Sequence, residues 1–439
     1  MKKKNILYTG FIAAVLLLGL ILSLGMLVCG PSRAGANEQL SPKPTLVRAD
    51  GSWNPDFLGD CVTWFSDHFF LRQELISLHN LISAKVLGTS GADSVILGRN
   101  GWLYYADTLA DYSYSNAMTE QEIFAAANNL RLMEDYCLEN GSRFLFALTP
   151  NKNSLYPMNM PVEIPYSSRS NQENLFASLE EMNVAYADLF AAFRAEDEIL
   201  YFAHDSHWDS KGAALGADVI NQGFGRESSY YWGAFQWKNH QGDLYAMLYP
   251  AFQDPEEDQA YRGGLEFTYT GSGKKPDSIT LETAGTGEGK LLAYRDSFGN
   301  LLYPYLAESF GEALFSRSTV YDLTVPADYV LIQLVERNIP YLITYVPVMP
   351  SPAVEIALPE NAGGTVALET GKGKTPEGYV QLRGLAADAV GTVYVVCGAI
   401  TYEAFLLREG EFAVNVPVGA TAEAIVYATD SGVCLLNVQ

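Results

Sequence analysis

The sequence has little of what metal centres and disulfide frameworks are built from. Among its 439 residues there are only five cysteines and five histidines. No two cysteines are spaced as Cys-x-x-Cys, the arrangement typical of structural zinc sites, which excludes a zinc finger or ribbon. Cys397 and Cys434 are candidates for a disulfide, although two reduced, buried thiols explain these residues at least as well.

Positive charge is also scarce. The chain carries 28 lysines and arginines against 51 acidic residues, a net charge of −23. Proteins that bind nucleic acid need a basic face, so we exclude nucleic acid as a partner. A hydrophobic share of 48% with 18% charged residues is typical of a globular protein and excludes collagen, a long coiled coil and bulk disorder.

One segment near the N-terminus lacks charge altogether. Residues 5–32 have no charged side chain and directly follow three consecutive lysines. A membrane-spanning helix needs about 20 apolar residues, and Ile6 to Val28 supplies them. Because lysines favour the cytoplasmic side, we expect residues 1–30 to form a single-pass anchor in the cell membrane, with the rest of the chain extracellular.

Two alternatives to an anchor remain open. A cleaved signal peptide would use the small residues of Ser32–Ala36 as its cleavage site, but the apolar segment is longer than the roughly 7–15 residues usual for a signal. Lipidation at Cys29 would make the chain a lipoprotein, but Val28 is a poor residue directly before a lipidated cysteine. The anchor is therefore the favoured interpretation.

The remaining chain divides into three parts by composition. Residues 31–58 contain four prolines among serine, asparagine and glycine, which predicts a linker or stalk. Residues 59–348 alternate between helical and strand-like patterns, which predicts an α/β domain around a parallel sheet. Residues 349–439 contain alternating apolar runs separated by glycine and proline turns, which predicts a small β-sandwich.

Local signals place individual elements in the α/β part. Thr119 and Glu122 form a capping-box pattern that begins a helix, and Asn140-Gly141 ends it. An uninterrupted apolar run at residues 144–148 then predicts a buried strand. Further strands are expected at residues 184–186, 200–202, 291–294 and 329–334, and a second helix near Asn174 to Met182.

Three residues have the types that nucleophilic acyl transfer requires. A serine hydroxyl becomes a nucleophile when an imidazole takes its proton and a carboxylate orients that imidazole. Asp205 and His207 are two residues apart, so in an extended segment their side chains project to the same side. Ser297 lies where a predicted strand turns into a helix, and the backbone N–H groups there can hold an oxyanion. Ligands bind at the carboxyl ends of strands in open α/β sheets, so we expect the three residues to converge.

These residues also have plainer explanations. Asp205 and His207 fit a surface turn, and Asp296-Ser297 fits an ordinary helix N-cap. A metal site would recruit His204 and Asp209 together with Asp205 and His207, but no regular third-ligand motif supports it. We therefore expect no metal and no cofactor.

Other polar and aromatic residues can be explained by either a structural or a functional role. The aromatic residues of segment 102–105 fit a packed cluster better than a platform for sugar stacking. Arg295 and Arg317 are candidates for substrate contacts, although either can pair with a carboxylate instead. The acidic run Asp254–Asp258 is expected to be a solvated loop rather than a calcium site.

Longer motifs surround the three residues of the acyl-transfer hypothesis. His204–Ala213 reads HDSHWDSKGA, and Tyr294–Gly299 reads YRDSFG. Further motifs are DHFFLR at 67–72, GRNGWLYY at 98–105, PNKNSLY at 150–156 and VERN at 335–338. Together they resemble the DHHW family and the related AlgX/AlgJ-like acetyltransferases of the SGNH-hydrolase superfamily, over about residues 60–345.

The resemblance implies a fold and a set of roles. The fold is that of a circularly permuted SGNH hydrolase, in which the serine block follows the histidine block, and Asp205, His207 and Ser297 inherit the catalytic roles. The sequence departs from the family at position 206, which is serine, and it lacks the usual Gly-x-Asn-Asp block. Asn338 or Arg337 is then expected to take the place of that block at a strand end.

The expected function follows from the resemblance and the external location. We expect an extracytoplasmic O-acetyltransferase that forms an acyl-serine and passes the acyl group to a polysaccharide hydroxyl. Because acetyl-CoA is cytosolic, the resemblance implies a membrane-bound O-acyltransferase as the partner that delivers acetyl groups. A carbohydrate esterase with the same three residues, or a surface protein that binds polysaccharide without catalysis, remain alternatives.

Overall fold

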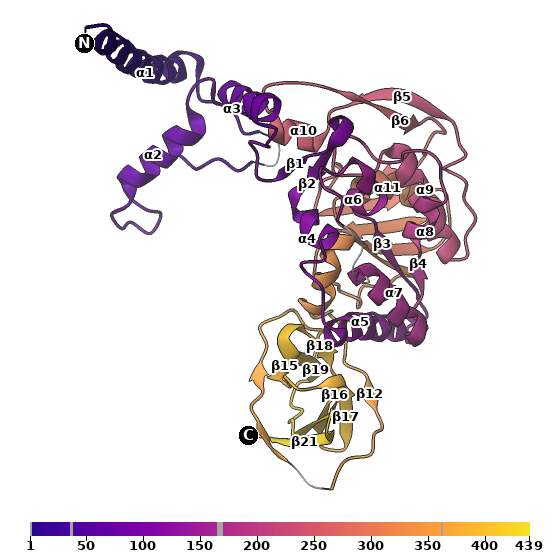
Figure 1. The fold of residues 1–439 in the computed structure, drawn as a ribbon. Coiled ribbons are helices and arrows are strands. Elements are labelled where there is room, and N and C mark those ends of the chain that lie inside the picture. Colours follow the sequence, from indigo (N-terminus) through magenta and orange to yellow (C-terminus); the bar gives the residue numbers. More distant parts are fainter. Residues whose placement is uncertain (1, 36–37, 165–169, 361–362) are drawn as a thin grey trace.

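The computed structural model describes residues 2–35, 38–164, 170–360 and 363–439. Helix α1 (Lys2–Cys29) stands apart from the body at one end of the molecule, and a strand-rich C-terminal part lies at the other end (Figure 1). Within α1, Tyr8–Cys29 has a mean hydropathy of 2.8 and is 0% buried. This helix has the length and composition of a membrane anchor or a signal.

The centre of the body is a mixed sheet of seven strands in the order β4-β3-β11-β9-β10-β8-β7. The first five run parallel, and β8 and β7 complete the sheet as antiparallel edge strands. The strands are β3 (Arg143–Thr149), β4 (Tyr186–Ala187), β7 (Thr268–Tyr269), β8 (Thr280–Ala284), β9 (Lys290–Tyr294), β10 (Glu312–Ser316) and β11 (Tyr329–Val335). A parallel α/β core, as predicted, is thus present.

Helices cover both faces of this sheet. Along β3, Phe144, Phe146 and Leu148 pack into the core under α5 (Glu120–Glu139) and α7 (Asn171–Met182). Leu145 and Ala147 point into the opposite core, with side chains from α8, α9 and α11. The bounds of these helices are Leu189–Arg194, Ser210–Gly223 and Gly299–Ser309. Both faces of the strand are buried, which explains its uninterrupted apolar run.

The predicted helix starts are largely found. The capping box at Thr119 and Glu122 is present, and it begins α5 as expected. Helix α7 begins at Asn171, earlier than its apolar pattern suggests, because Ser170 and Glu173 form a second capping box. Two reciprocal hydrogen bonds at each box satisfy backbone and side-chain groups that would otherwise lack partners.

Two local predictions were wrong. Residues 200–202 form no strand of the sheet, and Tyr201 makes only an isolated bridge to Trp208. The acidic run is not a solvated loop, because strand β6 (Glu256–Tyr261) contains most of it and pairs with β5 (Phe235–His240). The second error arises because β6 forms by pairing with β5, which the local composition does not reveal.

The C-terminal part is a β-sandwich, as predicted. One sheet has the order β12-β17-β16-β20-β21-β13 and the other β14-β15-β19-β18. The first contains β12 (Ala353–Val354), β13 (Gly364–Val366), β16 (Val390–Cys397), β17 (Ile400–Glu403), β20 (Ala424–Thr429) and β21 (Gly432–Val438). The second contains β14 (Glu369–Thr370), β15 (Tyr379–Leu385), β18 (Phe405–Leu406) and β19 (Glu411–Pro417). Cys397 and Cys434 are both free thiols here.

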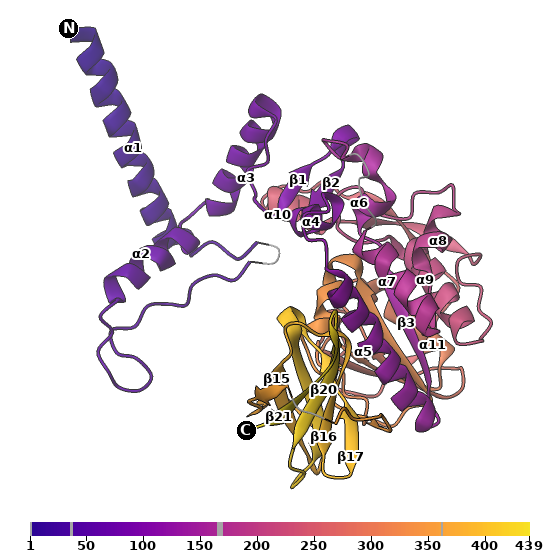
Figure 2. The ribbon, with the colours of Figure 1, turned by 60° about the horizontal axis from the view of Figure 1, so that its bottom comes forward.

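The sandwich lies against helix α5 (Figure 2). Its apolar residues and those of α5 form one continuous core. The buried side chain of Asn129 in α5 donates to the carbonyls of Leu342 and Leu406 and accepts from the Leu406 N–H. Arg131, also in α5, pairs with Glu403 of the sandwich. The sandwich is therefore fixed to the α/β domain.

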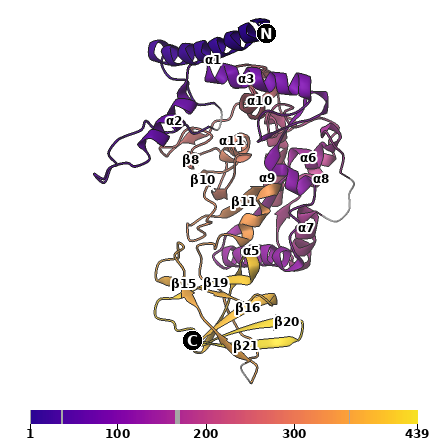
Figure 3. The same ribbon diagram turned by 60° about the vertical axis from the view of Figure 1, so that its left-hand side comes forward.

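The N-terminal segment after α1 folds back on itself. Helices α2 (Phe57–His68) and α3 (Arg72–Ile82) follow it, and α3 continues into a π-helical turn, Ser83–Leu87. Figure 3 shows α1 and α3 at the end of the molecule opposite the sandwich. The remaining short elements are β1 (Val95–Leu97), β2 (Leu103–Tyr105), α4 (Leu109–Tyr112), α6 (Lys152–Leu155), α10 (Asp243–Leu248) and a 3-10 helix at Glu336–Ile343.

Candidate active site

Ser297, His207 and Asp205 lie together although Ser297 is 90 residues from His207 in the sequence. Ser297 stands in the turn between β9 and α11, at the carboxyl end of a central strand. Asp205 and His207 come from the loop that precedes α9. The three residues therefore converge as predicted. Ser297 follows the end of a sheet strand, whereas Asp205 and His207 lie in a loop.

The three side chains form a continuous run of hydrogen bonds. Nδ1 of His207 is 2.7 Å from Oδ1 of Asp205, and Nε2 of His207 is 2.8 Å from Oγ of Ser297. Because a carboxylate only accepts, Nδ1 carries a hydrogen and Nε2 is free to accept the Ser297 proton. This is the geometry that a general base and its nucleophile require.

Aromatic packing fixes the two segments against each other. The indole N–H of Trp208 donates to the carbonyl of Phe298 at 3.1 Å. The Phe298 ring lies 4.7 Å from the His207 imidazole and packs edge-on against Trp208. The two segments therefore hold each other in place, and this packing limits the movement of the His207 imidazole.

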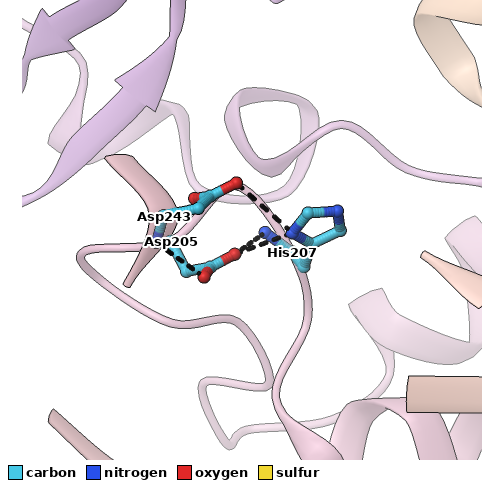
Figure 4. A group of neighbouring side chains, drawn as sticks. All are labelled: Asp205, His207 and Asp243. Carbon is cyan, nitrogen blue, oxygen red and sulfur yellow. Dashed lines mark hydrogen bonds and ion pairs between the residues drawn. The ribbon is translucent and has the colours of Figure 1, made fainter. Parts of the chain in front are cut away.

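A second layer of groups holds the Asp205 carboxylate. Its Oδ2 accepts from Nε2 of His240 and from the backbone N–H of Asp243, each at 2.9 Å. Asp243 in turn accepts from the hydroxyl and the N–H of Ser206. Figure 4 shows the Asp205 and Asp243 carboxylates on the Nδ1 side of the His207 ring, with Nε2 pointing away from them.

The chain that brings His240 and Asp243 here passes very close to the loop that carries Asp205 and His207. A Cβ on Gly242 would lie 2.2 Å from the His204 carbonyl oxygen, which is closer than any side chain can approach. Glycine at this position therefore lets the segment after β5 lie directly against the loop. Without that close approach, His240 and Asp243 could not reach Asp205.

A buried lysine and a half-buried glutamate hold the backbone of the same loop. The ammonium group of Lys152 donates to the carbonyls of Phe202, Ala203 and Asp205 at 2.9, 2.9 and 2.7 Å. The carboxylate of Glu256 accepts the N–H groups of Ala203 and His204 at 2.7 and 2.9 Å. Since this loop has no strand neighbours beyond one bridge, these side chains replace the hydrogen bonds of a sheet.

The Ser297 turn is held by the neighbouring Asp296. One carboxylate oxygen of Asp296 accepts from the Phe298 N–H, and the other accepts from the Val335 N–H at 2.6 Å. The amide of Gln333 in β11 also donates to Asp296, at 3.1 Å. The turn is therefore tied to the adjacent strand of the sheet.

The charges around His207 favour an ionised Asp205. Burial alone raises the pKa of Asp205, but hydrogen bonds from His207 and His240 outweigh it and hold the pKa well below 3.8. Burial lowers the pKa of His207, whereas the hydrogen bond and charge of Asp205 raise it, with a net pKa above 6.5. The imidazole is therefore a stronger base than free histidine.

Two cavities meet at Ser297. The first, of about 570 Å³, also contains Asp205, His207, His240 and Met247 in its wall. The second, of about 500 Å³, reaches Arg408 at the edge of the sandwich. Both are lined by Tyr105, Ser297, Arg317 and Arg337. Ser297 thus lies in the wall of both cavities.

The other predicted site residues lie near Ser297 but differ in their contacts. Arg317 lines both cavities, and among the described residues its guanidinium group makes one hydrogen bond, at 3.3 Å to the Asp277 carbonyl. Arg295 is buried, and it donates to Asn300 Oδ1 and to the Pro276 carbonyl, each at 2.7 Å. Asn338 lines the second cavity and approaches Oδ2 of Asp296 at 3.4 Å.

The aromatic segment 102–105 divides between two environments. Trp102 and Tyr104 are buried, and the Tyr104 hydroxyl donates to the Tyr156 carbonyl at 2.6 Å. Their rings lie about 5 Å from the Lys152 ammonium group, as a packed cluster around a buried cation. Tyr105 instead lines both cavities beside Ser297.

The four residues of the metal alternative are not gathered in one place. Asp209 caps helix α9 through the Gly212 N–H, and His204 lies 4.0 Å from Asp254. Asp205, His207 and Asp243 do have ligand atoms within 4.8 Å of one another. A cation among them would displace the hydrogen bond between Asp205 and His207, so the donor set fits a hydrogen-bonded run better than a metal site.

Sequence reasoning gave no role to His240 or Asp243. Neither belongs to a motif with Asp205, and both reach it only because strand β5 and its following turn fold over the loop that carries Asp205. Glu256 was likewise assigned to a solvated run, although its carboxylate holds that loop. A pattern in the sequence carries no signal for such contacts, because they depend on tertiary approach.

Residues 95–255 match the family described as the SGNH hydrolase-like domain of the acetyltransferase AlgX. This range includes Asp205 and His207, and it confirms the resemblance that the motifs indicated. Among curated proteins, none matches the sequence significantly.

Several solved structures are similar to the chain. A DHHW family protein from Eubacterium siraeum has 16% identity and a TM-score of 0.38, over 49% of this chain and 85% of that one. The O-acetyltransferase domain of Pseudomonas putida AlgJ has 19% identity and a TM-score of 0.38, over 56% and 92%. Bacillus cereus PatB1, in a structure with a sulfonyl adduct, has 18% identity and a TM-score of 0.43, over 56% and 95%.

Proposed function

We propose that this chain, which carries an SGNH hydrolase-like domain of the AlgX acetyltransferase type, is an extracytoplasmic O-acetyltransferase acting on a polysaccharide through Ser297. The observation that carries the proposal is the run of hydrogen bonds from Asp205 through His207 to Ser297 at the wall of a cavity. Asp205 is the orienting carboxylate, His207 the general base and Ser297 the nucleophile.

The reaction has two steps that use the same base. In the first, His207 Nε2 takes the Ser297 proton while Oγ forms a bond to the acyl carbonyl carbon, and the donor leaves with that proton. In the second, His207 takes the proton of an acceptor hydroxyl, whose oxygen attacks the acyl carbon; the bond from that carbon to Oγ breaks, and His207 returns the proton to Ser297. The acetyl group is thereby moved from the donor to the acceptor as an ester, and no atom or charge is left over.

The negative oxygen that develops in both steps needs donors near Ser297. The described contacts give the Ser297 backbone N–H no acceptor, so this group can bind the oxyanion. Arg317 and Arg337 line both cavities at Ser297 and carry no salt bridge within the described part of the chain. We assign these two arginines to substrate contacts, and we assign Arg295 and Asn338 to positioning the turn.

The two cavities provide room for two substrates. Ser297 lines both spaces, so an acyl group on it can be reached from either cavity. The second cavity reaches the sandwich at Arg408, which allows a long acceptor to extend along the molecule. This arrangement supports transfer between two bound substrates over an esterase, in which water alone would accept the acyl group.

The location and the donor complete the proposal. Helix α1 anchors the chain in the cell membrane and leaves the body on the outer side, in agreement with the three lysines before the apolar span. A membrane-bound O-acyltransferase supplies the acetyl group from inside the cell. Ser297 then receives it outside.

The decisive experiment compares the full-length protein with Ser297→Ala. p-Nitrophenyl acetate serves as donor, and cellopentaose and tetragalacturonate serve as neutral and acidic acceptors. We expect a burst of p-nitrophenol and acetylated oligosaccharide from the wild type, and neither from Ser297→Ala at unchanged circular dichroism. Free acetate without acetylated oligosaccharide would favour the esterase, and unchanged turnover in Ser297→Ala would exclude Ser297 as the nucleophile.

A further inference from the structure

Helices α2 and α3 present apolar side chains to the outside rather than to the body. In α2 no residue is buried, and Leu58, Val62 and Phe65, spaced for one helix face, are exposed, with Leu58 at 77%. In α3 and the turn that extends it, Leu78, Ile82 and Val86 form a similar exposed row, with Val86 at 73%. We call these six residues the apolar face.

The side of α3 that faces the body is polar, whereas a helix on a water-exposed surface has its apolar side there. Ser77 and Asn80 are buried, and the Asn80 amide donates to the Leu248 carbonyl at the end of α10. The Ser77 hydroxyl accepts the Ala251 N–H. A surface helix in water turns its apolar residues inward, so this orientation fits a helix whose outer side meets an apolar medium.

The link between α2 and α3 packs on the outer end of α1. Phe70, in the link between α2 and α3, packs so closely on α1 that a Cβ on Gly25 would lie 2.3 Å from its ring. The Ser32 N–H also donates to the His68 carbonyl at 2.9 Å. At a rise of about 1.5 Å per residue, Gly25 lies roughly 6 Å inside the end of the apolar helix at Cys29.

Further contacts fasten this junction. Arg72 at the start of α3 pairs with Glu38 at 2.6 Å, and Gln73 donates to the Arg33 carbonyl. Asp67 in α2 accepts from the N–H of Ser41 at 2.9 Å. Residues 31–58 are therefore folded against α2 and α3 at these points, which keeps the two helices close to α1 (Figure 2).

From these observations we propose that the apolar face docks on the outer leaflet of the lipid bilayer in which α1 is anchored. The proposal rests on the membrane location given above for α1. Lipid is favoured as the occupant because the link between α2 and α3 packs on the last turns of the apolar helix α1. The chain is strongly acidic, so docking depends on apolar insertion rather than on attraction to anionic headgroups. Glu74 and Lys85 flank the row on α3, where their long side chains can reach the headgroups.

Docking in this way orients the path to Ser297. A cavity of about 420 Å³ is lined by Gln73 and Ile76 of α3 at one end and by Tyr105 and Met247 at the other. Tyr105 and Met247 also line the larger cavity at Ser297. A docked face therefore turns this series of cavities toward the membrane, from which an acyl group would arrive.

The test uses nitroxide spin labels on the full-length chain in phosphatidylcholine nanodiscs, after intact-mass measurement shows that α1 is retained. Cys29, Cys61 and Cys434 are replaced by serine, and single cysteines are introduced as Val62→Cys and Ile82→Cys. Thr63→Cys, exposed on the other side of α2, is the matched control, and Val418→Cys is the control on the sandwich. Labels on the apolar face should collide at least threefold less with a water-soluble nickel complex than the controls, and more with oxygen.

Two outcomes would overturn the proposal. Equal nickel accessibility at Val62, Ile82 and Thr63 would mean that the face stays in water. Shielding only when a membrane acyltransferase is added to the nanodisc would identify a protein as the occupant instead of lipid. The measurement needs no acyl donor and should be the same in Ser297→Ala, so a failure of docking is distinguishable from a failure of catalysis. Circular dichroism and thermal unfolding exclude misfolded variants.

Discussion

The imidazole of His240 lies 2.9 Å from Oδ2 of Asp205, the carboxylate oxygen that does not contact His207. Asp205 therefore joins two imidazoles, with His207 on one oxygen and His240 on the other. The His240 ring is stacked on Phe202 with centroids 4.0 Å apart, so its position is fixed from a second direction. This contact makes His240 a positioning residue for the proposed base.

Removing the His240 donor should lower the rate without weakening substrate binding. In His240→Phe, which keeps the ring stacking, Asp205 loses one charged hydrogen bond, a contact usually worth about 1.5–3 kcal/mol. We expect kcat for p-nitrophenyl acetate to fall roughly 10- to 100-fold with KM nearly unchanged. His240→Gln can still donate and should recover part of the rate. Equal rates in His240→Phe and the wild type would show that Asp205 needs no second donor.

The pH dependence of acylation should report His207. Because Asp205 raises the net pKa of His207 above 6.5, the neutral base is lost as the pH falls through a value higher than that of free histidine. The acid limb of kcat/KM should therefore lie above pH 6.5. In Asp205→Asn the main causes that raise the pKa of His207 are removed, while burial still lowers it and the charge of Asp243 still raises it, so the limb should move to lower pH while the rate falls by about 10⁴-fold.

The same shift has a consequence for stability. His207 binds its proton more tightly in the folded chain than in the unfolded one, so its contribution to stability is complete below pH 6.5. That contribution is lost as the pH rises through the raised pKa. The wild type should therefore exceed His207→Gln in thermal unfolding temperature by less at pH 9 than at pH 5. A constant difference would contradict the raised pKa.

Glu256 should matter for activity although it is outside the proposed triad. Its carboxylate accepts two N–H groups of the loop that carries Asp205, and in Glu256→Ala those groups lose their partner. We expect at least a tenfold loss of p-nitrophenyl acetate turnover. The exposed neighbour in the same strand provides the control, since Glu257→Ala should leave turnover unchanged. Similar losses in both variants would point to the strand rather than the contact.

Replacing Arg317 should impair acyl transfer to an oligosaccharide more than acylation of Ser297 by a small donor. Arg317→Met removes a guanidinium group from the wall of both cavities without breaking a salt bridge within the described residues. We expect the p-nitrophenol burst to stay within about threefold of the wild type, and the yield of acetylated oligosaccharide to fall about tenfold, the effect of one lost charged contact. Arg262→Met, an exposed arginine, is the control. An unchanged yield would remove Arg317 from the substrate site.

The contact between helix α5 and the sandwich should be a main source of stability. Asn129 is buried and makes three hydrogen bonds to backbone groups of Leu342 and Leu406. Asn129→Ala leaves these groups without partners, at a cost of about 2–4 kcal/mol in the free energy of unfolding. Asn140→Ala, at the exposed end of the same helix, should cost less than about 1 kcal/mol. Urea unfolding followed by circular dichroism measures both.

Local sequence patterns were enough to predict the elements that depend only on neighbouring residues. The capping box at Thr119 and Glu122 and the apolar run at 144–148 each depend on neighbours within a few residues, and both elements form as predicted. The same reasoning failed at 200–202, where apolar residues suggested a strand. There the Leu200 N–H donates to the Tyr156 hydroxyl and the Phe202 carbonyl accepts from Lys152, side chains that lie 44 and 50 residues away in the sequence.

The sequence by itself determined the apolar N-terminal helix, the alternation of helices and strands, the sandwich, and the motifs that contain Asp205, His207 and Ser297. These follow from composition, hydrophobic period and residue spacing, which act along the chain. Tertiary structure decided that His207 meets Ser297 across 90 residues, that His240 and Asp243 hold Asp205, and that Glu256 supports the loop. Such contacts depend on which surfaces pack together, because a hydrogen bond requires approach within about 3 Å, whatever the separation in sequence.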